Sequence, residues 1–137
     1  MQAEWIMTLH VEVAAPLRVG RVPEGELMII PITGGTFAGP KLHGRVLPGG
    51  ADWNTRGSQE ESHALARYWI QTDDGAVLCV RNEGTLRPDD DAEGLRTTPT
   101  FQCDLDGPYA FLMRGIYAGT LKGAGANAVD IGIYRIG

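Results

Sequence analysis

The stretch Gly34-Gly35-Thr36-Phe37-Ala38-Gly39-Pro40, which runs on to Pro48-Gly49-Gly50-Ala51-Asp52-Trp53, decides the fold of this chain. Two glycine-rich turns bracket a short strand. Glycine at such turns lets the backbone take positive φ or approach another segment closely. The pattern predicts short strands joined by tight turns. The second turn also brings a carboxylate next to an indole.

Apolar residues alternate with others outward from these turns. Trp5, Met7, Leu9, Val11 and Val13 recur with a period of two, which is typical of a β-strand. Further strands are predicted over residues 26–32, 36–47, 63–72, 76–82, 98–105, 109–117 and 128–136, the second of them broken or bent at its glycines. Exposed loops are predicted over 54–62 and 87–94. The 19 glycines and 8 prolines suit many short strands better than long helices.

This pattern predicts an all-β fold, with residues 1–137 forming a single domain. Short turns between successive strands favour antiparallel pairing. We expect one antiparallel β-barrel of about eight to ten strands, with little or no helix, because closure removes exposed strand edges. The segment 109–117 is apolar on both faces. A homodimer or larger homo-oligomer is therefore expected, with a second copy covering the outer face.

Composition excludes several classes of partner. The chain has 137 residues and a formal net charge of −5, without a block of Lys or Arg. Binding to nucleic acid or to an anionic membrane surface is therefore not expected. No apolar run approaches the roughly 18 residues of a membrane span. The start of the chain lacks the pattern of a signal peptide, so a cytoplasmic location is expected.

Neither the cysteines nor the histidines form a recognisable site. Cys79 and Cys103 lie in apolar strand patterns without zinc-like spacing, which predicts two buried, reduced thiols. Nothing in the spacing of His10, His43 and His63 makes them converge on a metal. The chain also lacks phosphate-binding and dinucleotide-binding motifs. The sequence therefore predicts no metal and no cofactor.

Four motifs occur in order along the chain: Gly-Gly-x-Phe-x-Gly-Pro-x-Leu-x-Gly at 34–44, Pro-Gly-Gly-Ala-Asp-Trp at 48–53, Ala-Arg-Tyr at 66–68 and Arg-Thr-x-Pro-x-Phe at 96–101. Together they resemble the UPF0311 family, also called the domain of unknown function DUF3237, over nearly the whole chain. The resemblance implies a compact antiparallel β-barrel and brings no established activity. Gln102 and Phe111-Leu112-Met113 stand where the family often has an acidic residue and a later Trp-Leu-Asn.

Asp52 is the first candidate for a catalytic residue. Partial desolvation beside Trp53 would raise the pKa of its carboxyl into the range useful for a general acid or base. The alternative is that Asp52 accepts backbone N–H groups in the Gly49-Gly50 turn. Trp53 is interpreted as a wall that stacks on a ligand, with a core position as the alternative.

Arginine and aromatic residues complete the predicted site. Arg67 is a catalytic candidate that pairs with Asp52 or clamps an anionic ligand. Strand alternation lets only one of Arg67 and Tyr68 point inward, and Tyr68 is favoured because a phenol suits an apolar pocket. Arg96, Phe101 and Phe37 are predicted to contact the ligand with Trp53 and Tyr68. Arg81 and Asn82 are interpreted as a surface pair at a strand end.

Three functions fit these residues. The first is a cofactor-independent enzyme in which Asp52 moves a proton during isomerisation, elimination, cyclisation or hydrolysis. Its substrate would be a small apolar or aromatic molecule, with an anionic one left open. The second is a binding module for a small molecule, since about eight strands enclose room for one ligand. The third is a structural oligomer whose barrel is filled by its own side chains.

Overall fold

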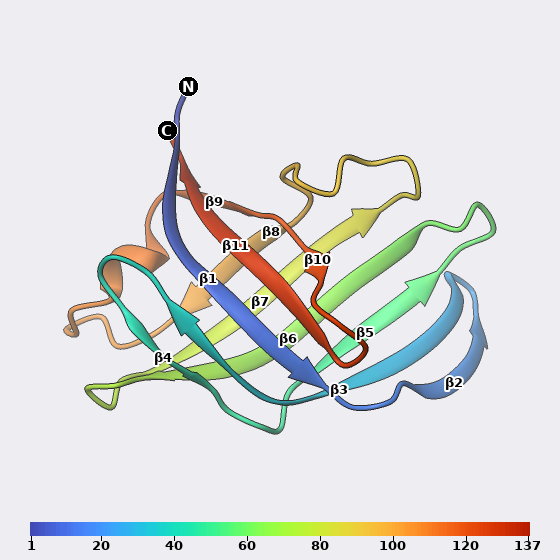
Figure 1. The fold of residues 1–137 in the computed structure, drawn as a ribbon, viewed down its shortest axis with the longest axis horizontal. Helices are drawn as coiled ribbons and strands as arrows, with labels where there is room; N and C mark the ends of the chain where they lie inside the picture. Colours follow the sequence, from blue (N-terminus) through green and yellow to red (C-terminus); the bar gives the residue numbers. More distant parts are fainter.

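A computed structural model describes residues 1–137 and shows an all-β barrel (Figure 1). Its single helical element is the short 3₁₀ turn η1 (Ala110–Met113). The strands are β1 (Ala3–Val13), β2 (Leu17–Val22), β3 (Gly25–Ala38), β4 (His43–Val46), β5 (Ala51–Arg56), β6 (Ser62–Thr72), β7 (Val77–Leu86), β8 (Thr98–Gln102), β9 (Ile116–Gly119), β10 (Lys122–Gly123) and β11 (Ala128–Ile136). The fold class expected from the sequence is confirmed.

All strand pairs are antiparallel, and together they form one continuous wall. The order β11, β1, β3, β4, β6, β7, β8 runs around the barrel, and β9 pairs with the other edge of β11. The barrel closes where Thr97, just before β8, forms a bridge with Gly119 at the end of β9. Every other neighbouring pair on this circuit shares at least three register positions, so the β8–β9 contact is the thinnest seam.

The long strand β3 connects the two ends of the molecule. Its C-terminal half pairs with β1 and β4, and its N-terminal half pairs with β2 and β5. Both β4 and β5 then pair with β6, so β6 receives two strands along its length. At Gly35, a Cβ atom would lie 2.0 Å from the carbonyl oxygen of His10, so only glycine lets β3 cross β1 so closely.

Several element boundaries differ from the sequence prediction. Gly34 and Gly35 lie inside β3 rather than ending it, and residues 54–56 belong to β5 rather than to a loop. Segment 109–117 is not one strand, because the chain turns through η1 before β9 begins. Its apolar residues cap the barrel: Leu112 is buried, and the Tyr117 hydroxyl donates to the Phe111 carbonyl at 2.9 Å.

The core is apolar and follows the alternation of each strand. Met7, Leu9 and Val11 of β1 are buried together with Ile70 of β6 and Leu78 of β7. Both cysteines are free, as expected. Neither is buried as predicted, however: Cys103 is half-buried, and Cys79 is exposed because it lies out of phase with the inward Leu78. No helix in the structure has the length and apolarity that a membrane crossing would need.

Candidate functional site

The barrel encloses a cavity of about 240 Å³ towards the β2–β3–β5 end. Residues of β1, β3, β5, β6, β7 and β11, together with Thr97 and Leu121, line it from several sides, which places it inside the barrel. The lining residues are Val11, Val13, Ile30, Ile32, Asp52, Asn54, Ser62, Ala64, Ala66, Tyr68, Asn82, Leu86, Thr97, Leu121, Val129 and Ile131. Most of this surface is apolar, and the polar side chains lie on β5, β6, β7 and Thr97.

Asp52 is held in this cavity by two hydrogen bonds. Its Oδ1 accepts from the backbone N–H of Leu65 on β6 at 2.9 Å, and its Oδ2 accepts from Asn54 Nδ2 at 3.2 Å. Asn54 Oδ1 in turn accepts from the Ser62 hydroxyl at 2.8 Å. The carboxylate does accept a backbone N–H, but from the facing strand rather than from the Gly49-Gly50 turn.

Burial governs the proton affinity of the two ionisable groups in the cavity. Desolvation raises the pKa of the Asp52 carboxyl above its ordinary value, against the opposing effects of the Asn54 and Leu65 hydrogen bonds and the charge of His63. Desolvation alone raises the pKa of Tyr68, so its hydroxyl stays protonated and remains a donor. The cavity thus pairs a carboxyl that can titrate with a phenol that does not.

Three polar atoms of residues that line the cavity lack a hydrogen-bond partner. They are Tyr68 Oη, Asn82 Oδ1 and Thr97 Oγ1, and each of these residues is at most 3% exposed. Asn82 was interpreted as a surface residue at a strand end, which is wrong. Strand β7 continues to Leu86, so Asn82 lies within it and follows Leu78 and Val80 on the inward face. That alternation was visible in the sequence.

The structure separates two of the predicted residues from Asp52. As expected, Tyr68 is inward, and Arg67 is therefore exposed on the outer face of β6. Trp53 is 40% exposed on the outer face of β5. Both line an outer groove of about 660 Å³, and two further predicted residues, Tyr68 and Phe101, are among the residues that line it. Arg67 and Asp52 thus lie on opposite faces of the sheet and form no ion pair.

Phe37, Phe101 and Arg96 do not line the cavity. Phe37 and Phe101 are 3% and 5% exposed and belong to the core, where Phe101 packs edge-on against Tyr117 with ring centres 5.7 Å apart. Arg96 is mostly buried beside the cavity wall, and its Nη1 donates to the carbonyl of Leu121 at 3.4 Å. Its Nε has no partner.

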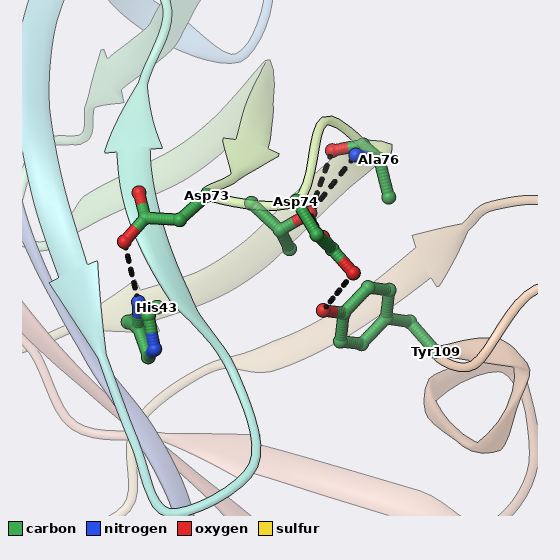
Figure 2. A network of polar contacts seen from close by, with 6 residues as sticks. His43, Asp73, Asp74, Ala76 and Tyr109 are labelled. Carbon is green, nitrogen blue, oxygen red and sulfur yellow. Dashed lines mark hydrogen bonds and ion pairs between the residues drawn. The ribbon is translucent and has the colours of Figure 1, made fainter.

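A second polar cluster lies at the β6–β7 hairpin, away from the cavity (Figure 2). The Tyr109 hydroxyl donates to Asp74 Oδ2 at 3.0 Å, and His43 Nδ1 lies 2.6 Å from Asp73 Oδ2. The N–H of Ala76 donates to Thr72 Oγ1 at 2.9 Å, which closes the turn. Since both aspartates are exposed, we interpret this cluster as a fastening of the hairpin to β4 and to the segment before η1.

The histidines do not come together. His10 Nδ1 lies 2.7 Å from Asp130, and His63 Nε2 lies 2.9 Å from Glu83, each on a different part of the outer surface from His43. No group of three or more His, Cys, Asp or Glu side chains is placed so that it could hold a metal ion.

Comparisons with known proteins identify the family. The model of the family described as "Protein of unknown function (DUF3237)" matches residues 1–136. A UPF0311 protein from Clostridium acetobutylicum is 30% identical over 132 residues, which cover 85% of this chain and 83% of that protein. A crystal structure from the same organism superposes with a TM-score of 0.89 at 28% identity, covering all of both chains.

Two other relatives match shorter segments of the sequence, and one further solved structure shares the fold. A UPF0311 protein from Rhodopseudomonas palustris is 34% identical over 84 residues, and the match covers 61% of this chain and about half (55%) of the relative. The hydroalkoxylation enzyme of Penicillium herquei is 42% identical over 55 residues, covering 40% of this chain and 36% of the enzyme. A solved enzyme structure from that fungus shares the fold, with a TM-score of 0.74 over 96% of this chain and 93% of that one at 23% identity.

Proposed function

The chain belongs to the DUF3237 family, and we propose that it binds a small, largely apolar molecule inside the barrel and transfers a proton on it through Asp52. One observation carries this proposal: the Asp52 carboxyl lines an apolar cavity in which desolvation raises its pKa. A carboxyl whose pKa moves towards neutral pH serves both as a general base and, once protonated, as a general acid.

The surroundings of Asp52 suit that role. The Leu65 N–H and the Asn54 amide fix the orientation of the carboxyl group, so it needs little rearrangement when a proton moves. Tyr68 adds a permanent donor for a developing oxyanion on the ligand. Arg67 has no part in this proposal because it is exposed on the other face of β6.

The Penicillium relative supports a reaction of this type. It is named a hydroalkoxylation enzyme, and hydroalkoxylation adds an alcohol O–H across a carbon–carbon double bond. In such an addition a C–O bond forms, the hydroxyl proton leaves the oxygen, and a proton is delivered to the neighbouring carbon. One carboxyl can accept the first proton and supply the second, which needs no cofactor. Isomerisation and elimination likewise need one proton removed and one delivered: isomerisation moves it between two carbons, and elimination takes it from carbon and gives one to the leaving group.

A non-catalytic binding protein is the second candidate. The unpartnered Tyr68, Asn82 and Thr97 side chains favour it, because they could orient a ligand without any titrating residue. The experiment that separates the two begins with a thermal-shift screen of neutral single-ring compounds. Bound compounds are then incubated in D₂O with the protein, and mass spectrometry measures deuterium entering carbon positions of the ligand.

Asp52→Asn is the test variant, and Asp89→Asn, which removes an exposed carboxyl from the acidic loop, is its matched control. We expect both variants to bind, with exchange lost in Asp52→Asn alone. Binding without exchange in the wild type would contradict the catalytic proposal and favour a non-catalytic binding protein. Exchange that continues unchanged in Asp52→Asn would remove Asp52 from the reaction.

A further inference from the structure

The polar groups of the cavity fall into two sets. On β5 and the start of β6, Asp52, Asn54 and Ser62 satisfy one another through hydrogen bonds. Further along β6, on β7 and just before β8, the side-chain atoms Tyr68 Oη, Asn82 Oδ1 and Thr97 Oγ1 have no hydrogen-bond partner, although these side chains are almost completely buried. Buried polar groups are nearly always hydrogen-bonded, so an unpaired set on a cavity wall indicates groups that a ligand satisfies.

The strand register places these groups around a small residue. Asp52 of β5 and Asn82 of β7 both lie opposite Ala66 of β6, one on each side. Two strand spacings separate their backbones, which is about 10 Å. Ala66, whose side chain is only a methyl group, is the β6 residue between them, and Tyr68 is the next inward residue on β6. A flat ligand over Ala66 would therefore have the Asp52 carboxyl at one edge, Asn82 at the opposite edge and Tyr68 next to it along β6.

The charge of the lining restricts the ligand further. No Arg, Lys or His side chain lines the cavity, and Asp52 is its only acidic side chain. An anionic ligand would be desolvated beside a carboxylate with no cation to compensate, which is strongly unfavourable. Arg96, which precedes the lining residue Thr97, donates Nη1 to a backbone carbonyl and lies outside the lining. The cavity therefore favours neutral ligands over the anionic ones that the sequence left open.

The hydrogen-bonding roles define what such a ligand carries. The Tyr68 hydroxyl is a donor that needs an acceptor, and Asn82 Oδ1 is an acceptor that needs a donor. Thr97 Oγ1 can serve either. The volume of about 240 Å³ corresponds to roughly eight waters at about 30 Å³ each, which suits a ligand with one ring.

We infer that the substrate is a neutral, single-ring-sized compound bearing a carbonyl and a hydroxyl group. Its carbonyl oxygen accepts from Tyr68, and its hydroxyl donates to Asn82. This inference rests on the proposed function, since it names the molecule on which Asp52 would act. It also places the carbonyl where Tyr68 stabilises an enolate when a proton leaves the adjacent carbon.

The test uses calorimetric binding to the full chain with five probes: ethylbenzene, acetophenone, meta-hydroxyacetophenone, para-hydroxyacetophenone and meta-hydroxybenzoate. We expect the better hydroxyacetophenone isomer to bind at least about tenfold more tightly than ethylbenzene. One new hydrogen bond to a buried, unpaired group accounts for a difference in affinity of that size. Hydroxybenzoate, the anionic analogue, should bind more weakly than either isomer.

Variants assign each contact. Tyr68→Phe should lower the affinity for acetophenone by about tenfold and leave that for ethylbenzene unchanged. Asn82→Leu should remove the advantage of hydroxyacetophenone over acetophenone. Tyr109→Phe is the matched control, since its hydroxyl belongs to the hairpin cluster outside the cavity (Figure 2), and it should change neither ratio.

Failure of this inference is distinguishable from failure of the proposed function. Ethylbenzene or hydroxybenzoate binding as tightly as the hydroxyacetophenones would overturn the inference, and so would equal ratios in the wild type and in Tyr68→Phe. Deuterium exchange at the methyl group of a bound hydroxyacetophenone that persists in Asp52→Asn would instead overturn the catalytic role and leave the recognition intact. If no probe binds the wild type, both are wrong.

Discussion

Replacing Tyr68 by phenylalanine should make the empty protein more stable. The Tyr68 side chain is 2% exposed, and its hydroxyl has no hydrogen-bond partner. In the unfolded chain that hydroxyl is hydrated, so folding strips it of water without a replacement. Burial of an unpaired polar group costs about 1–3 kcal/mol. Phenylalanine keeps the ring and its packing, so the variant should gain free energy of unfolding of about that size.

The gain should be visible in both chemical and thermal unfolding. For a domain of this size, 1 kcal/mol corresponds to about 3–5 °C in Tm, so Tyr68→Phe should melt about 3–15 °C above the wild type. Urea titrations of the two proteins at neutral pH, without ligand, measure the same difference as a shift in midpoint at unchanged slope. Tyr109→Phe provides the opposite control, because it loses the hydrogen bond to Asp74 and gains nothing.

A destabilised Tyr68→Phe would refute this reasoning. A loss of about 1 kcal/mol or more would mean that the hydroxyl has a partner in the folded protein, such as a tightly held water. The unpaired wall would then be satisfied without a ligand, and the argument for a carbonyl-bearing substrate would lose its main support. A ligand should reduce the difference by about 1.4 kcal/mol, since hydroxyacetophenone at saturation should stabilise the wild type more than a variant that binds it about tenfold more weakly.

Three further predictions concern other parts of the barrel. Burial raises the pKa of Asp52 in the folded protein, so the stability that this carboxyl contributes is fully present below its unfolded pKa and is lost as the pH rises through its folded pKa. Asn does not titrate. The unfolding free energy of Asp52→Asn minus that of the wild type should therefore increase from about pH 3 to about pH 7. Gly50→Ala should cost about 1–3 kcal/mol in urea unfolding, because the new methyl would lie 2.5 Å from a carbonyl oxygen of β6, whereas Gly123→Ala meets nothing within 4 Å and should be close to neutral. Iodoacetamide should alkylate exposed Cys79 well before half-buried Cys103, since desolvation raises the pKa of the Cys103 thiol, and equal rates measured by mass spectrometry would contradict the assigned faces.

A homo-oligomer stays a prediction. Segment 109–117, from which it was inferred, forms η1 and the start of β9 rather than one two-faced strand. Exposed apolar side chains do occur on β5, β6 and β7, where Trp53, Trp69 and Val77 are between 37% and 50% exposed. Light scattering checks the mass in solution, and a mass equal to one chain would contradict the prediction.

Alternation made much of the fold predictable from sequence. The period of two in β6 places Tyr68 rather than Arg67 inside. In β1 the alternation holds from Met7 to Val11 but breaks at the irregularity between Trp5 and Met7, where Ile6 and Met7 are both buried and Trp5 is exposed. The errors came where composition competed with topology. Polar residues 54–56 resembled a loop but pair with β3, and apolar residues 110–113 resembled a strand but cap the barrel as η1.

The candidate site was predicted only in part, for a related reason. Asp52 and Trp53 are adjacent, and adjacency in sequence suggested a shared pocket. Because Asp52 proved to lie in a strand, the same adjacency sends the two side chains to opposite faces. Asn82 was missed because an amide after an arginine looks like a strand end. The alternation with Leu78 and Val80 already indicated an inward position, and the pairing of β7 with β6 beyond Asn82 shows that the strand does not end there.

The closing seam links the architecture to access. Between β8 and β9, three backbone hydrogen bonds join Arg96 and Thr97 to Gly119, at 2.7 to 3.1 Å. Thr97 also lines the chamber. Segments with few hydrogen bonds open most readily, so we expect a ligand to enter the barrel by local opening of this seam. A ligand that hydrogen-bonds to the Thr97 hydroxyl would stabilise the closed seam, and amide hydrogen exchange at Arg96, Thr97 and Gly119 would slow when the ligand binds.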